Sequence, residues 1–188
     1  YYFSAVDFEW MINQIFEQMA TQQEMSAEEL QAAQAFMTKT SMTWSTTLGG
    51  AMGIIVANLV MAVYFNLITK VSSPNELTFT AWFGFSWWTS MPAVVSWILA
   101  ALVIMFSSAG MVSLEDLSPT SLGFLADRSS PWFGLLSGIS LFSLWSIALG
   151  TIGLSSWLVL TPKKAFIIAV SPTLAIYTCW ALYISFAG

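Results

Sequence analysis

The stretch that decides the fold is ISLFSLWSIALGTIGLSSWLVLTPKK, which runs from Ile139 to Lys164. It is apolar and uncharged as far as Pro162, and two lysines follow this proline. At about 1.5 Å per residue, a helix of this length exceeds a hydrocarbon core of about 30 Å. The stretch therefore predicts a membrane-spanning helix that ends at a basic pair.

The whole chain has the composition of an integral membrane protein. Of its 188 residues 57% are hydrophobic and 8% are charged, with a mean hydropathy of +0.74. Soluble domains carry about 25% charged residues, so a water-soluble surface is excluded. The net charge of −5 does not favour nucleic acid binding. The chain has no histidine, and its one cysteine, Cys179, lies in an apolar run, so we predict no metal, cofactor or disulfide.

Four uncharged runs predict an all-helical, polytopic transmembrane bundle, with spans at residues 46–69, 79–108, 131–160 and 165–187. The second run contains Pro92, and the residue before a proline avoids the helical region. We therefore expect a kink or a broken helix near Met91. The third run is longer than one perpendicular span. It is either one tilted helix or a short interfacial piece around 131–140 followed by a span.

Residues 1–43 form a polar helical segment outside the membrane domain of residues 44–188. Apolar residues recur every three or four positions from Phe8 to Met19, which predicts an amphipathic helix. This helix either packs against the rest of the chain or contacts a partner or the membrane surface. A capping-box pattern that begins at Ser26 predicts a second helix, continuous with the first span.

The basic residues predict how the chain is threaded. Lys70, Lys163 and Lys164 lie in short connections at one end of a four-span bundle, whereas most acidic residues fall at the other end. Because lysine and arginine in short loops favour the cytoplasm, we expect these three lysines inside and residues 1–43 outside. An N-terminus outside needs a cleaved signal or an earlier span, and we expect a fifth span before Tyr1.

A family resemblance rests on the motif Ile-Ser-Leu-Phe-Ser-Leu-Trp at 139–145, the later Ile-Gly-Leu at 152–154, and the lysine pair. This pattern resembles the signature of the Yip1 domain family, which is close to Leu-Asp-Leu-Phe-Ser-Leu-Trp, an apolar stretch with glycine, and a basic pair. Ser140 stands where the family often has Asp. The segments SSPWFGLLS and MSAEELQAAQAFM resemble the bacterial form.

The resemblance implies an all-helical membrane bundle, commonly of five spans with a cytoplasmic N-terminus. Eukaryotic members bind small GTPases and other membrane proteins in early secretory traffic, and bacterial members are similar in fold. The low content of Lys and Arg and the acidic N-terminal region favour a multi-pass protein of the bacterial inner membrane, with residues 1–43 in the periplasm.

Several residues are candidates for helix packing or partner contact: Gly49, Gly53, Asn58, Pro92, Ser140, Phe142, Trp145 and Gly153. The spacing of Gly49 and Gly53 predicts close approach of a helix, either from the same chain or from a second copy. Serines at 137, 140, 143 and 146 predict a wide polar strip that serves packing or lines a path. The aromatic residues at 82–88 are typical of an interfacial belt, with a pocket for a lipid or an aromatic ligand below Pro92 as the alternative.

Catalysis is not predicted, because the four apolar runs contain no acid or base to activate a nucleophile. Two hypotheses remain. The first is a Yip1-like, non-catalytic scaffold or accessory subunit that binds other integral membrane proteins. The second is a passive channel, transporter or lipid-handling protein with its path between the second and third runs. The expected partners are membrane lipids and other integral membrane proteins. A homo-oligomer is a further alternative.

Overall fold

The computed structural model describes residues 2–22, 36–107, 111–128 and 130–187. These residues form helices, and strand-like pairing within them is limited to an isolated bridge between Ser121 and Ser140. The helices are α1 (Tyr2–Ala5), α2 (Phe8–Gln22), α4 (Lys39–Ser72), α5 (Phe79–Thr89), α6 (Pro92–Phe106), η1 (Glu115–Leu117), η2 (Leu122–Leu125), α7 (Phe133–Gly138), α8 (Leu141–Trp157) and α9 (Pro162–Ala187). The all-helical prediction is confirmed.

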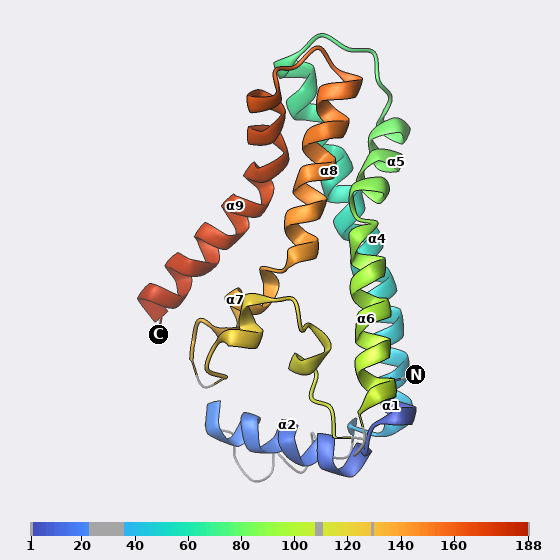
Figure 1. Cartoon of the computed structure of the whole chain (residues 1–188), viewed down its shortest axis with the longest axis vertical. Coiled ribbons are helices and arrows are strands. Elements are labelled where there is room, and N and C mark those ends of the chain that lie inside the picture. The colour runs from blue at the N-terminus through green and yellow to red at the C-terminus, as the bar shows by residue number, and fades with distance from the viewer. Residues whose placement is uncertain (1, 23–35, 108–110, 129, 188) are drawn as a thin grey trace.

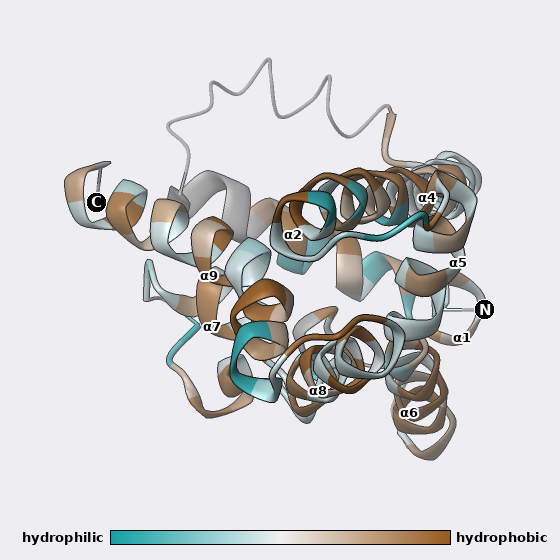
Figure 2. Cartoon of the chain, turned by 90° about the horizontal axis from the view of Figure 1, so that it is seen from above, coloured by the Kyte–Doolittle hydropathy of each residue, from teal (hydrophilic) through white to brown (hydrophobic). Residues whose placement is uncertain are grey.

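Within the described residues, three helical units are long and apolar enough to cross a membrane: α4, the α5–α6 pair and α9. Helix α8 is apolar but has only 17 residues. In Figure 1 these helices run along the long axis, and α2 lies across one end. The hydrophobic colour predominates on α4, α6 and α8 in Figure 2. The chain is thus a multi-pass membrane protein, and a count of four or five spans stays a prediction.

Helix α4 begins at Lys39 because Thr38 caps it. Thr38 has extended backbone angles, and its hydroxyl accepts a hydrogen bond from the Ser41 N–H at 3.2 Å. The Ser41 hydroxyl in turn accepts from the Thr38 N–H, which completes a capping box. The predicted continuous helix into the first span is therefore wrong at Met37 and Thr38, which are not helical. The predicted cap at Ser26 lies outside the described residues.

The break before Pro92 is confirmed, although its geometry differs from the prediction. Met91 keeps helical backbone angles, φ −54° and ψ −33°, so steric exclusion of the helical region before proline is not the cause. Instead, Ala93 and Val94 donate their N–H groups to the carbonyls of Ser90 and Met91, three residues back. Because proline has no N–H to donate, the helix tightens into one such turn between α5 and α6.

The third apolar run is divided into the short α7 and the longer α8, which is the second of the two predicted arrangements. Ser140 separates them with extended backbone angles, φ −128° and ψ 164°. Its neighbours join the preceding loop, since the Leu122 N–H donates to the Ile139 carbonyl at 2.9 Å. The chain before α8 therefore folds back under the bundle instead of continuing as one long helix.

Helix α9 contains Pro172 and is tied to α4 at the same point. A proline removes the hydrogen bond to the carbonyl four residues earlier, which here belongs to Ile168. The Tyr64 hydroxyl of α4 donates to that carbonyl at 2.9 Å and lies 2.6 Å from the Ser171 hydroxyl. The C-terminal part of α9 leads away from α8 in Figure 1.

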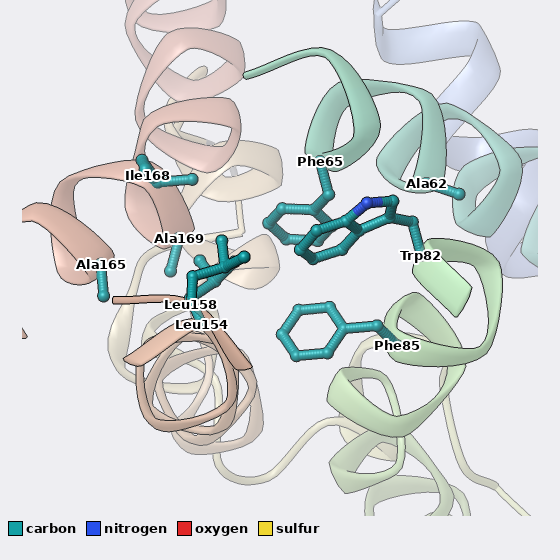
Figure 3. Packing of buried hydrophobic residues seen from close by; sticks show 9 residues of the cluster. All are labelled: Ala62, Phe65, Trp82, Phe85, Leu154, Leu158, Ala165, Ile168 and Ala169. Atoms are coloured by element: carbon teal, nitrogen blue, oxygen red, sulfur yellow. The ribbon is translucent and has the colours of Figure 1, made fainter. Parts of the chain in front are cut away.

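The main core lies where α4, α5, α8 and α9 meet (Figure 3). Trp82 is fully buried there. Its ring stacks on Phe65 with 6.0 Å between ring centroids, and it meets Phe85 edge-on with 5.6 Å between ring centroids. The interpretation of the 82–88 cluster as an interfacial belt is therefore wrong for Trp82 and Phe85. Trp87 and Trp88 remain exposed on the outside of α5.

The N-terminal helices form a second, smaller core against the membrane helices. The Asp7 carboxylate accepts hydrogen bonds from the N–H groups of Glu9 and Trp10 and so caps α2. Met11 is buried with residues of α1, and Met42 of α4 and Val103 of α6 pack against this cluster. Of the two predicted roles for the amphipathic helix, the structure shows packing against the same chain.

The ends of the bundle differ in charge. The Lys164 ammonium donates to the Ser72 carbonyl at 2.6 Å, which brings the α8–α9 and α4–α5 connections together. At the opposite end, Arg128 forms a salt bridge with Asp116 at 2.7 Å. The predicted placement of the lysine-bearing connections at one common end is confirmed, and which end faces the cytoplasm stays a prediction.

Candidate functional site

A cavity of about 410 Å³ lies among α4, the α5–α6 break, α6, α8 and α9. Its apolar wall includes Phe65, Trp97 and Phe142. Pockets that bind small molecules typically measure about 300–1,000 Å³, so this volume is sufficient for one. The cavity lies between the second and third apolar runs, where the sequence placed the path of the alternative hypothesis.

Hydroxyl side chains dominate the polar part of the lining. Seven of the lining residues are serine or threonine: Thr89, Ser90, Ser96, Ser140, Ser143, Ser146 and Thr173. None of the described lining residues carries a charge. In a low-dielectric environment such a lining suits a neutral ligand and disfavours a charged one.

Four of these hydroxyls are occupied within the protein. The Thr89 hydroxyl donates to the Ser86 carbonyl at 3.0 Å, and the Ser90 hydroxyl lies 3.0 Å from Asn58 Oδ1. The Ser143 hydroxyl donates to the Ser140 carbonyl at 2.7 Å, and the Ser140 hydroxyl accepts from the Ser143 N–H. These bonds stabilise the two helix breaks that border the cavity.

The other three hydroxyls make no hydrogen bond with the described residues. They belong to Ser96 of α6, Ser146 of α8 and Thr173 of α9, so three different helices present them to one space. A serine or threonine within a helix can donate to the carbonyl four residues back, as Thr151 and Ser155 of α8 do. The three cavity hydroxyls do not, and this leaves each one available to a ligand.

Asn58, a candidate for helix packing, lies at the contact between α4 and α5. It is buried, and its amide donates to the Ile54 carbonyl of its own helix at 2.9 Å. Its side-chain oxygen accepts from Ser90, and its backbone carbonyl accepts from Ser86 at 3.0 Å. Asn58 thus connects α4 to the end of α5. The Oδ1 atom of Asn66, in contrast, is buried without a partner in the described structure.

Gly153 of α8 faces the Phe85 ring of α5. A Cβ atom built there would come within 2.4 Å of the Phe85 ring, so any side chain would collide with it. Nearby, Phe142 is buried at the cavity wall, whereas Trp145 is about half exposed. The Phe142 and Trp145 rings are 6.5 Å apart. The motif 139–145 therefore caps α8, lines the cavity and presents one aromatic ring to the outside.

Gly49 and Gly53 are not internal contacts in the structure. A Cβ atom at Gly49, Gly50 or Gly53 would meet nothing within 4 Å. We call these three residues the α4 glycine face. Among the described residues, no element approaches this part of α4, so the predicted approach of a helix from the same chain is not seen there. Contact with another chain stays a prediction.

The serine strip is divided between two roles. Ser140, Ser143 and Ser146 line the cavity, whereas the Ser137 hydroxyl donates to the Phe133 carbonyl at 2.8 Å and lies against Gly123. Sequence reasoning did not single out Ser96 or Thr173. Each is a hydroxyl side chain in an apolar helix, and such residues are enriched where membrane helices pack, which is the signal that would have found them.

Ser140 is predicted to contribute to stability through its side-chain oxygen alone. Ser140→Ala removes the acceptor for the Ser143 N–H and should cost about 1 kcal/mol of unfolding free energy. Ser140→Asp should retain most of the stability, because a carboxylate accepts the same bond. Unfolding of the purified protein in mixed micelles measures both. Ser156→Ala, at an exposed α8 position, is the control, and equal loss in the Ala and Asp variants would contradict this role.

The position of Ser140, where the Yip1 family often has Asp, is the N-cap of α8. Serine and aspartate are both favoured N-cap residues, which gives the resemblance of the 139–145 motif a structural basis. No curated protein and no solved structure matches the chain. The family model described as Yip1 domain matches residues 1–183, which is nearly the whole chain. The chain belongs to the Yip1 domain family.

Proposed function

We propose that this protein is a non-catalytic membrane scaffold or accessory subunit that binds another integral membrane protein through the α4 glycine face. The observation that carries the proposal is the open space around Gly49, Gly50 and Gly53. In a bilayer, small residues at this spacing let two helix backbones approach closely. The neighbouring Leu48 and Met52 are exposed and would complete an apolar contact.

The glycines of α8 support the assignment by contrast. A Cβ atom at Gly150 would lie 3.4 Å from Ala169 of α9, and Gly153 abuts Phe85 of α5. The chain thus uses small residues of α8 for close helix contacts. The α4 glycine face has the same residue type at a packing spacing, and the occupant we propose is one transmembrane helix of a different protein.

The non-catalytic assignment rests on chemistry. The sequence contains no histidine, and the cavity lining contains no ionisable side chain that would act as a general base. Within the described residues, no group of three His, Cys, Asp or Glu side chains is arranged to hold a metal ion. We further propose that the protein lies in a bacterial inner membrane with Lys70, Lys163 and Lys164 in the cytoplasm.

Site-directed photocrosslinking in the native membrane tests the scaffold proposal. A photoreactive residue at position 57 lies on the glycine face one turn beyond Gly53, and the same residue at position 55 lies on another side of α4. We expect a protein adduct of defined mass from position 57 only. Gly53→Ile should reduce this adduct roughly tenfold, the effect of about 1.4 kcal/mol, because a branched side chain prevents close approach.

Ala51→Ile, on the opposite side of α4, is the matched control and should leave the adduct unchanged. An adduct of twice the mass of the chain would assign the face to a second copy and overturn the proposal of a different partner. Adducts with lipid alone, or equal adducts from positions 55 and 57, would show that α4 faces the bilayer here.

A further inference from the structure

The cavity combines features that favour an amphiphile over water or an ion. Unpaired hydroxyls of Ser96, Ser146 and Thr173 converge on it from three helices, and its other walls carry aromatic rings. A second groove, of about 350 Å³, is lined by residues of α8 and α9 and shares the lining residue Ile147 with the cavity. Hydroxyl groups beside aromatic rings in one cavity match a molecule with a polar part and a hydrocarbon chain.

The chemistry of the lining limits the polar part to a neutral group. No described lining residue carries a charge, so a carboxylate, phosphate or ammonium group in the cavity would have no counter-charge. Hydroxyl side chains donate to carbonyl oxygens and accept from hydroxyls. Ester carbonyls and a glycerol hydroxyl therefore fit the three unpaired hydroxyls.

Entry of such a molecule from the bilayer is expected beside α9. Thr173 of the cavity follows Pro172 directly, and the C-terminal part of α9 leads away from α8 (Figure 1). Two α9 residues that precede this proline also line the two spaces, Ala169 in the cavity and Val170 in the second groove.

We propose that this cavity binds the uncharged diacylglycerol portion of a membrane lipid. Its ester and glycerol oxygens bond to Ser96, Ser146 and Thr173, and one acyl chain runs along Phe65 and Phe142. The occupied site holds α6, α8 and α9 together through one ligand. The proposal is independent of the α4 glycine face, so failure of either leaves the other standing.

Photolabelling of the purified full chain tests the proposal. The probe is a diacylglycerol analogue with a photoreactive acyl chain, and unlabelled diacylglycerol is the competitor. We expect competed labelling of peptides that contain Ser96, Ser146 or Thr173. The combined variant Ser96→Ala, Ser146→Ala and Thr173→Val keeps the cavity shape and removes all three donors. It should lose labelling by at least about tenfold, since several hydrogen bonds are lost at once.

Ser146→Phe fills the cavity and should lose labelling to the same extent. Ser156 supplies the matched controls, because its exposed hydroxyl already donates to the Ile152 carbonyl and lines neither space. Ser156→Ala and Ser156→Phe should label like the unchanged protein. Where Ser146→Phe does not fold, the combined variant decides, since its substitutions preserve side-chain volume.

Three results would overturn the proposal. Labelling that persists in the combined variant would show ordinary contact with surrounding lipid. Equal labelling by a photoreactive fatty acid, whose carboxylate is charged, would contradict the neutral site. Absence of competed labelling at the cavity peptides would show that diacylglycerol does not bind in the cavity.

Discussion

Gly153→Ala is expected to destabilise the bundle by about 1–3 kcal/mol, the usual cost of overpacking a core. The new Cβ atom would come within 2.4 Å of the Phe85 ring. The Phe85 ring cannot move aside, because it is buried between two other aromatic rings. Its centroid lies 5.1 Å from that of Trp157 and 5.2 Å from that of Phe65. Loss of secondary structure during titration of the micelle-bound protein with a denaturing detergent measures the change.

Gly84→Ala is the matched control, since a Cβ atom there meets nothing within 4 Å. It should stabilise α5 by up to about 1 kcal/mol, because alanine favours a helix over glycine. The two substitutions are chemically identical and should have opposite signs. Phe85→Leu should rescue part of the loss in the Gly153→Ala protein. Equal effects at both glycines, or no rescue, would contradict the contact between α8 and α5.

Single cysteines at the two ends of the bundle are expected to differ completely in their reaction with a reagent outside the membrane, so that only one end reacts. In a Cys179→Ser background, a cysteine at Asp127 should react with an impermeant maleimide added to sealed, right-side-out vesicles. A cysteine at Lys163 should react only after the membrane is permeabilised. The reason is the lysine excess in the short connections that the Lys164–Ser72 bond joins.

A cysteine at Glu76, in the α4–α5 connection, is the control for this assignment. It should behave like position 163, because both connections lie at the same end of the bundle. Reaction of position 163 from outside in intact vesicles would reverse the proposed orientation. Equal reaction of positions 127 and 163 in intact vesicles would show that the vesicles leak.

The sequence was sufficient for the helical membrane class because composition alone excludes a soluble surface. It also located the break at Pro92, where backbone chemistry is local because a proline lacks an N–H. It left open whether residues 131–160 form one helix or two, and the Ser140 cap that divides them was not predicted. It did not locate the start of α4. Thr38 and Ser41 cap each other with two hydroxyls, and the usual glutamate at the third position is absent.

The cavity and the roles of the glycines depend on how helices pack, and packing was not readable from one chain. Gly49 and Gly153 look alike as small residues in apolar runs, yet one is uncovered and the other lies against an aromatic ring. Trp82 and Trp88 occur in one aromatic cluster, yet only Trp82 is buried. Which face of a helix is covered is decided by elements distant in sequence.

The hydrogen bond from Tyr64 to the Ile168 carbonyl couples two positions that are far apart in the sequence, 64 and 172. Pro172 is tolerable within α9 because a donor from α4 occupies the carbonyl that the proline leaves free. A chain with alanine at 172 would no longer need that donor, and a chain with phenylalanine at 64 would tolerate the proline less well. The effects of changing both are therefore not additive. We therefore expect Tyr64→Phe to destabilise the protein less in a Pro172→Ala background than in the unchanged chain.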